Sequence, residues 1–271
     1  DEAGTALTTG DNNVAVGYGA LDAEDTGTDS VAIGYNALTA QNNDSTNYNV
    51  AIGSSAGAAV TTGVQNILVG ALAGDAITTG NSNVSVGHGS LSLNTASHRN
   101  TAIGEFSLAA LNITTSTNAY NTALGYSAGA AVTTGTNNVL MGGLSGDALT
   151  TGSTNVAVGT SALTTDTLGS RAVAVGEGAL AAQNFTTATN NYNVGVGYSA
   201  GGAITTGTFN TLIGGLAGDA LTDADQNVAI GLNALTQDTL GSFSVAVGTS
   251  ALGTQNFTTA TNTYNTAVGH S

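Results

Sequence analysis

The sequence predicts an all-β protein, a parallel β-solenoid or β-roll made of short coils. One pattern, Val/Thr/Ile, any residue, Val/Ile/Leu/Met and then Gly, recurs along the whole chain at nearly constant spacing. Such self-similarity is the signature of a repeat architecture. The chain is also rich in Gly, Thr and Asn and poor in Glu, Lys and Arg, which disfavours helices. The Gly of the pattern stands at positions 17, 34, 53, 70, 87, 104, 125, 142, 159, 176, 197, 214, 231, 248 and 269.

A longer period is nested in the short one. The common spacing is 17 residues and every fourth coil has 21, so that Gly53, Gly125, Gly197 and Gly269 are equally spaced and mark successive blocks. We expect a single solenoid domain over residues 1–271, with coil blocks 54–125, 126–197 and 198–269 and a partial block 1–53.

Each coil is expected to hold about two strands. In "NVAVG" the residues alternate, so that Val14 and Val16 lie on one face and Ala15 on the other, which is the period of a strand. A second apolar piece, such as "GALDA" at 19–23, is expected to form the second strand, and a Thr-Gly turn closes the coil. The Gly after the strand supplies a positive φ or permits a close backbone approach.

An Asn precedes the pattern in most coils and is expected to form a structural ladder. If coils stack at about 4.8 Å, each amide can bond to the next. The positions are Asn13, Asn49, Asn66, Asn83, Asn100, Asn121, Asn138, Asn155, Asn193, Asn210, Asn227 and Asn265.

A row of small residues at the second position of the pattern predicts self-association. A short coil rich in Ala and Gly buries little apolar area alone. We expect the small residues to form a surface where other chains approach closely, giving an intertwined or packed homotrimer. The row includes Ala15, Ala32, Ala51, Ala102, Ala123, Ala157 and Ala174.

The repeats resemble those of a known family. "NVAIG", "NTALGYSAG" and above all "SVAIGYNA" at 30–37 are similar to the head repeats of trimeric autotransporter adhesins. The pattern is also similar to the Gly/Asn/Thr-rich repeats of viral tail fibres. The resemblance covers essentially the whole chain and implies a left-handed parallel β-roll that is trimeric, extracellular and adhesive. The period departs from that family, whose heads use shorter coils.

Composition argues against several classes of function. Two cations, Arg99 and Arg171, stand against 17 carboxylates, for a formal net charge of −15. We therefore expect no nucleic-acid binding through phosphate neutralisation. The chain has no Cys and no apolar run of about 18 residues, so we expect neither thiolate chemistry nor a membrane span. The three histidines share no position in the repeat, and we expect no enzyme activity and no cofactor.

Calcium is the exception that the sequence raises. Asp75, Asp147 and Asp219 recur at the same place of successive blocks, in "GDA". In a multimer these carboxylates could meet around an axis and hold Ca²⁺. We favour the alternative, a solvated turn residue that binds nearby backbone N–H groups.

The longer coils carry insertions that are candidate surface-contact loops. Each contains an Asn-x-Ser/Thr sequence and a Tyr. Tyr and Asn on regularly spaced loops suit a glycan or another surface ligand, whereas structural padding of a wider coil, which we favour, and glycosylation of the Asn are the alternatives. The residues are Asn43, Tyr48, Asn112, Tyr120, Asn184, Tyr192, Asn256 and Tyr264.

These observations favour a structural or adhesive extracellular fibre segment, either a shaft or a head. Block duplication lengthens a fibre without creating a new site. The alternatives are a glycan-binding or glycan-degrading spike and, because of Thr pairs such as Thr61-Thr62, an ice-binding surface. The two ends are complementary halves of a coil, so we expect either a window of a longer fibre or a subunit that stacks head to tail.

Overall fold

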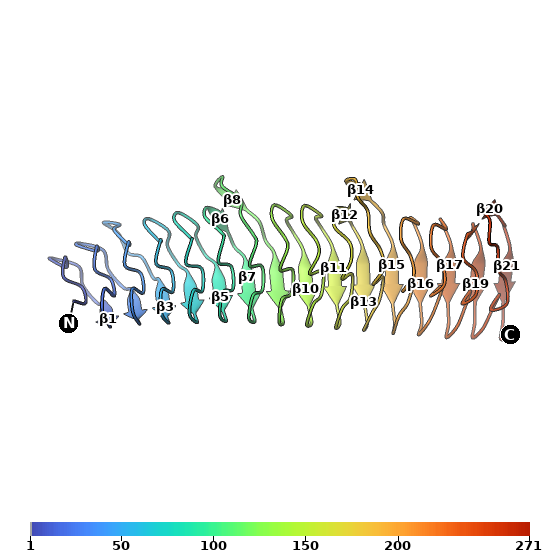
Figure 1. The fold of residues 1–271 in the computed structure, drawn as a ribbon, viewed down its shortest axis with the longest axis horizontal. Helices are drawn as coiled ribbons and strands as arrows, with labels where there is room; N and C mark the ends of the chain where they lie inside the picture. Colours follow the sequence, from blue (N-terminus) through green and yellow to red (C-terminus); the bar gives the residue numbers. More distant parts are fainter. Residues whose placement is uncertain (1) are drawn as a thin grey trace. The chain divides into compact units, whose positions relative to one another are not determined.

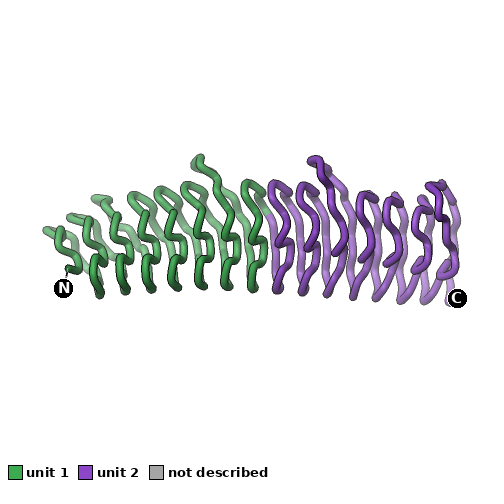
Figure 2. Tube along the Cα trace, viewed as in Figure 1, with its two compact units in different colours: residues 1–137 green, residues 138–271 purple. Residues whose placement is uncertain are grey.

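The computed structural model describes residues 2–271 and divides into two compact units, residues 1–137 and 138–271 (Figure 2). Each unit is a parallel β-solenoid, and no helix occurs in the described residues. Residues of one coil bond to their equivalents 17 residues later, as Asn49 does to Asn66. The predicted fold class, an all-β parallel solenoid of short coils, is therefore confirmed.

Each unit contains one long ladder of three-residue strands and shorter two-residue strands beside it (Figure 1). In unit 1 the ladder comprises β1 (Val14–Val16), β2 (Val31–Ile33), β3 (Val50–Ile52), β4 (Ile67–Val69), β5 (Val84–Val86), β7 (Thr101–Ile103) and β9 (Thr122–Leu124), and the short pair is β6 (Ser97–His98) and β8 (Thr117–Asn118). In unit 2 the ladder comprises β10 (Val139–Met141), β11 (Val156–Val158), β13 (Val173–Val175), β15 (Val194–Val196), β16 (Thr211–Ile213), β17 (Val228–Ile230), β19 (Val245–Val247) and β21 (Thr266–Val268). Its short strands are β12 (Gly169–Ser170), β14 (Thr189–Asn190), β18 (Gly241–Ser242) and β20 (Thr261–Asn262).

Within each unit the ladder keeps strict register. Val50 pairs with Ile67 and Ile67 with Val84, so each strand meets its own equivalent one coil later. Where the coil is longer the register is unchanged, because Thr101 still pairs with Thr122. The additional residues therefore leave the cross-section as a loop.

The small residues of the pattern lie inside the coil and not on an association surface. Ala32, Ala51 and Ala102 are fully buried, while the residues on either side, such as Val50 and Ile52, face outward. The expectation that the alanine row meets other chains is therefore wrong. The alternation was correct, but both faces of the strand are apolar, and the central residue of the strand faces inward whether it is Ala or, as at Leu68, Leu140 and Leu212, a larger side chain.

The Gly that ends each strand is required for both reasons considered. Gly53 has a φ of 139°, a region that L residues rarely adopt. A Cβ placed on Gly53 would lie 2.5 Å from the carbonyl carbon and oxygen of Gly70 in the next coil. Backbone approaches backbone here at a distance that admits no side chain.

The second apolar piece of each coil does not form the expected second strand. It is a series of turns in which alternate residues have positive φ, for example Leu72 at 56° and Gly74 at 56°. Backbone hydrogen bonds still run from coil to coil, as from Gly57 N to Ala73 O at 3.0 Å. Because a strand requires negative φ throughout, this side stacks without being a sheet.

The expected Asn ladder exists, and it is buried except at Asn13, which is half-buried, and Asn265, which is exposed. Asn66 is fully inaccessible, and its Oδ1 accepts a hydrogen bond from the backbone N of Asn83 at 3.0 Å. Its Nδ2 donates to the carbonyl of Gly80 at 2.9 Å. The amide thus satisfies a backbone donor and a backbone acceptor at the corner that precedes each ladder strand.

No helix in residues 2–271 is long and apolar enough to cross a bilayer.

Candidate functional site

The long coils form corners that stand out from the repeat. In unit 1, β6 pairs with β8 in parallel, Ser97 with Thr117 and His98 with Asn118. In unit 2, β12 pairs with β14 and β18 with β20 in the same way. The loops that carry β8 and β14 protrude beyond their neighbours within each unit (Figure 1). We call each such pair, with the residues that follow it, a wide corner.

A buried carboxylate anchors the loop of a wide corner. Asp166 is fully buried, and its Oδ1 accepts hydrogen bonds from the backbone N of Gly169 and Phe185 at 3.0 and 3.1 Å. Its Oδ2 accepts from Gln183 Nε2 at 2.6 Å, and Gln183 Oε1 in turn accepts from Asn193 Nδ2 at 2.8 Å. Burial raises the pKa of the Asp166 carboxyl, and these hydrogen bonds oppose part of the rise.

The same arrangement recurs at Asp238 with Gln255 and, with a longer acid, at Glu24 with Gln41. In each case the amide residue follows the acid by 17 residues, one coil later. At the wide corner of β6 and β8, Asn94 and Leu111 take these places, and Asn94 bonds to Ser97 instead. The acid and the glutamine therefore occur together or not at all.

The four predicted tyrosines lie on the surface in equivalent places. Tyr48, Tyr120, Tyr192 and Tyr264 are all exposed, and their φ angles are 52°, 52°, 53° and 53°. The asparagines predicted with them do not join the tyrosines. Asn112 and Asn184 accept hydrogen bonds from Thr95 and Thr167 of the preceding coil, Asn43 donates to Asn47, and Asn256 is exposed.

Each of the two arginines of the chain lies against one of these tyrosines. Arg99 directly follows β6, and its guanidinium donates to the hydroxyl of Tyr120 at 3.2 Å and stands 5.7 Å from the ring centroid. Arg171 directly follows β12 and donates to the hydroxyl of Tyr192 at 2.9 Å, 5.4 Å from that ring. Each unit thus contains one arginine–tyrosine pair, built in the same way.

In unit 2, further aromatic rings stack on two of these tyrosines. Tyr192 stacks on Phe209 with ring centroids 5.4 Å apart. At the corner of β18 and β20, Phe243 occupies the place of the arginine and stacks on Tyr264 at 5.3 Å. The same position is therefore filled by a cation at two corners and by a neutral ring at the third.

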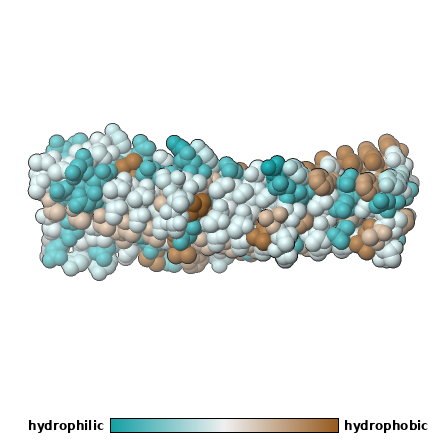
Figure 3. All heavy atoms as spheres, turned by 90° about the horizontal axis from the view of Figure 1, so that it is seen from above, coloured by the Kyte–Doolittle hydropathy of each residue, from teal (hydrophilic) through white to brown (hydrophobic). Residues whose placement is uncertain are grey.

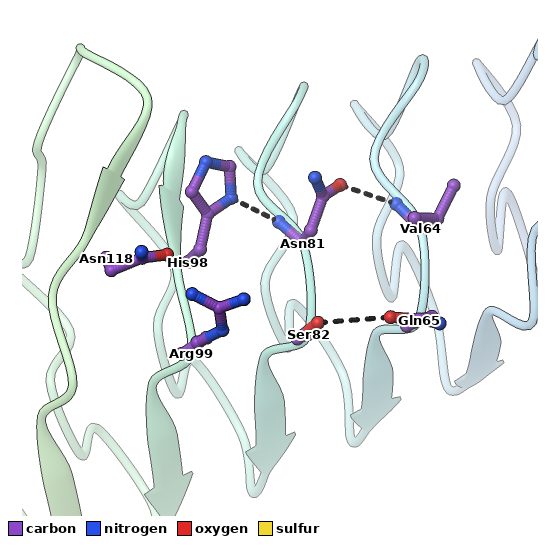
Figure 4. A pocket seen from close by; sticks show the side chains of 7 residues that line it. All are labelled: Val64, Gln65, Asn81, Ser82, His98, Arg99 and Asn118. Atoms are coloured by element: carbon purple, nitrogen blue, oxygen red, sulfur yellow. Dashed lines mark hydrogen bonds between the residues drawn. The ribbon is translucent and has the colours of Figure 1, made fainter.

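A pocket of about 200 Å³ opens at the corner of unit 1 (Figure 4). Arg99 and His98 face Asn81 and Ser82 of the preceding coil in this view. No carboxylate lines the pocket, whose seven residues are Val64, Gln65, Asn81, Ser82, His98, Arg99 and Asn118.

His98 is held in place as a neutral acceptor. Its Nδ1 accepts a hydrogen bond from the backbone N of Asn81 at 2.8 Å, and its Nε2 lies 2.7 Å from Ser116 Oγ. Burial and, to a smaller extent, the charge of Arg99 lower the pKa of His98. In unit 2 the equivalent acceptor is Ser170, whose Oγ accepts a hydrogen bond from the backbone N of Ser153 at 3.0 Å.

The three aspartates considered for calcium lie in separate coils. Asp147 Oδ1 accepts from Thr164 at 2.5 Å and Asp219 Oδ1 from Thr236 at 2.6 Å, each from the next coil. Asp75 lacks such a threonine, its Oδ1 is buried without a partner, and burial raises its pKa. In residues 2–271 no three acidic, His or Cys side chains converge on one point, so calcium binding stays a prediction for a multimer.

The surface viewed from above in Figure 3 is mostly of intermediate hydropathy, with separate hydrophilic and hydrophobic patches. This is the appearance expected of a chain with 7% charged residues and many Thr, Ser and Gly.

Sequence reasoning found the tyrosines but missed their arginine partners and the buried acids. Arg99 and Arg171 stand at the same place of successive blocks, and each precedes its Tyr by 21 positions. Because this interval is the length of a wide coil, the spacing alone places the two side chains one above the other. The 17-residue spacing of Asp166 and Gln183 carried the same information.

Comparison with known proteins finds no family model, no curated protein and no solved structure that matches this chain.

Proposed function

We propose that the chain is a structural segment of an extracellular fibre, with an adhesive and non-catalytic role, in which three copies associate through the outward face of the strand ladder. The observation that carries this proposal is the composition of that face. The first and third residues of each ladder strand point outward, and all of them in both units are Val, Ile, Leu, Met or Thr.

The first and third residues of the ladder strands form two outward rows, which are unusually apolar for a surface. Val16 is 55% exposed, Ile67 43% and Ile213 38%, although they belong to regular strands with one face already buried. Contiguous exposed apolar patches on a folded protein mark interaction surfaces. No charged side chain interrupts either row, so the face has no feature that would oppose close contact.

A second copy of the same chain is the occupant that fits this face. The rows present apolar or Thr side chains, most of them β-branched, at each coil, so that the face of one copy presents the same spacing as the face of another. Closed symmetry about a common axis would cover the face of every copy at once. The resemblance to trimeric adhesin heads supports three copies.

Paired variants test the proposal through the mass in solution. Replacing Ile52 and Ile67 by Thr keeps β-branched residues in the strands but removes apolar area from the face. Sedimentation should show an oligomer for the parent chain and a shift toward the monomer for this variant. Leu93→Thr is the control, because Leu93 is 53% exposed but lies outside the strands. An oligomer that is unchanged by the paired variant would contradict the proposed face.

A further inference from the structure

We propose that the wide corner at Arg99 binds an oxyanion, carboxylate or sulfate, that is carried on a glycan, and that the corner at Arg171 binds the same chemistry. This inference goes beyond the structural role proposed above and does not depend on the number of chains in the fibre.

The placement of positive charge is the first argument. The chain has no Lys and two Arg residues, and both arginines occupy the same position of a wide corner. In residues 2–271 neither forms an ion pair, the one such pair being His88 with Glu105. Each guanidinium is therefore a local positive centre without a carboxylate partner, in a chain with a net charge of −15.

The free hydrogen-bonding capacity of the guanidinium is the second argument. A guanidinium has five N–H donors in a planar fork. The structure gives each arginine one side-chain acceptor, the hydroxyl of the tyrosine one wide coil later. The tyrosine holds the group by stacking and by its hydroxyl, and the remaining donors suit an oxyanion, which arginine binds in a bidentate manner.

The pocket at Arg99 accepts a small polar group. Its volume of about 200 Å³ is below that of pockets for drug-sized ligands. Gln65, Ser82 and Asn118 offer amide and hydroxyl groups at its wall. The net negative charge of the chain repels polyanions at long range, but at physiological salt this repulsion is screened beyond about 8 Å, whereas the guanidinium acts at contact.

A glycan fits these features better than an acidic peptide. Tyr120 is 51% exposed although Arg99 lies over one face of its ring, so that the exposed remainder of the ring offers an apolar surface to a sugar ring beside the charged group. The amide and hydroxyl groups of the wall match sugar hydroxyls.

The third wide corner of the chain is a built-in control. Phe243 stacks on Tyr264 at 5.3 Å, where Arg99 and Arg171 stack on their tyrosines. A neutral ring therefore suffices to complete this corner of the fold. The arginines add a charge that the stack itself does not require.

The test compares the parent chain with two variants that copy its own corners. In Arg99→Phe/Arg171→Phe both sites are given the residue found at Phe243, and Phe243→Arg introduces the third cation. Binding is measured by calorimetry at physiological salt with dextran sulfate, alginate, neutral dextran and polyglutamate. The unfolding temperature of each variant verifies that the corner still folds.

We expect the parent chain to bind dextran sulfate or alginate. Binding of dextran sulfate would identify sulfate as the group recognised, and binding of alginate would identify carboxylate. The double variant should lose about tenfold or more in affinity, as expected for one charge-assisted hydrogen-bonded contact. Phe243→Arg should increase the number of sites per chain. The proposal is overturned if neither charged glycan binds, if the double variant keeps the parent affinity, or if neutral dextran or polyglutamate binds as tightly.

Discussion

Gln183 Nε2 donates a 2.6 Å hydrogen bond to Asp166 Oδ2 in the interior of unit 2. The two residues are one coil apart, and their contact fixes the point at which the wide coil leaves the regular cross-section. Gln183 also accepts from Asn193, so that the carboxylate, the amide and the Asn ladder form one connected network. A fully connected buried network stabilises a unique arrangement, but it is sensitive to the loss of any member.

Asp166→Asn should destabilise the wide coil by about 1–3 kcal/mol, the cost of an unsatisfied buried group. The new Nδ2 would face the Nε2 of Gln183, and Gln183 cannot turn around without losing Asn193. The double variant Asp166→Asn/Gln183→Leu should recover stability relative to Asp166→Asn, because Asn94 and Leu111 occupy the equivalent places in unit 1.

Hydrogen exchange at the Phe185 amide, which donates to Asp166, measures the effect locally. A double-mutant cycle with no coupling between positions 166 and 183 would show that the contact does not carry the network.

His98 should make unit 1 less stable in acid. Its pKa is lowered in the folded chain, so protonation favours the unfolded chain, and stability falls as the pH decreases through about 6.5, the ordinary His value, toward the lowered one. Protonation also removes the acceptor of the Asn81 backbone N.

His98→Ser should abolish this dependence and leave the corner folded, since Ser170 provides the same acceptor in unit 2. Amide exchange at Asn81, followed from pH 7.5 to 5, distinguishes the two chains. An equal loss of protection in both would mean that His98 is not the titrating group.

Gly53→Ala should cost at least about 2 kcal/mol, because the residue has a φ of 139° and its Cβ would meet Gly70 at 2.5 Å. The control is Gly143→Ala, where a Cβ has no neighbour within 4 Å. That change should be neutral or slightly stabilising. Urea unfolding of the two variants compares them, and similar midpoints would contradict the role of the close backbone approach.

Asn66→Ala should destabilise unit 1 by about 2 kcal/mol or more, since the backbone N of Asn83 and the carbonyl of Gly80 both lose a buried partner. At position 172 the chain itself has Ala in place of the ladder Asn, and the structure there shows how the loss of the amide is tolerated. In the coil after Ala172, the amide N of Asn193 bonds instead to Asn191 Oδ1, from the inserted loop. The coil of Asn83 has no such loop. Fast exchange of the Asn83 amide in the variant is the expected signal, and unchanged protection would contradict it.

Much of the fold could be predicted from the sequence because the repeat itself carries the register. The constant spacing of Val50, Ile67 and their equivalents predicts their pairing, and the recurring Asn predicts the ladder. The side of the strand that faces inward could not be predicted in this way. Ala51 and Ile52 are both apolar, and alternation assigns them to opposite faces without showing which face is buried.

The turns and the wide corners were harder to predict for a different reason. Leu72 has a φ of 56°, a conformation that Leu rarely adopts, so the residue type gives no local indication of the turn. The pairs Arg99 with Tyr120 and Asp166 with Gln183 are distant in sequence and become visible only when residues are compared coil by coil.

The most direct test of the proposed assembly measures distances between copies at the strand face. The chain has no Cys, so Ile52→Cys introduces a single site for a spin label on that face, and Leu93→Cys provides one outside the strands. If three copies meet through the strand ladder, dipolar spectroscopy should show a short distance between labels at position 52 and a longer one at position 93. An absence of dipolar coupling at position 52, with the fold intact, would contradict the account.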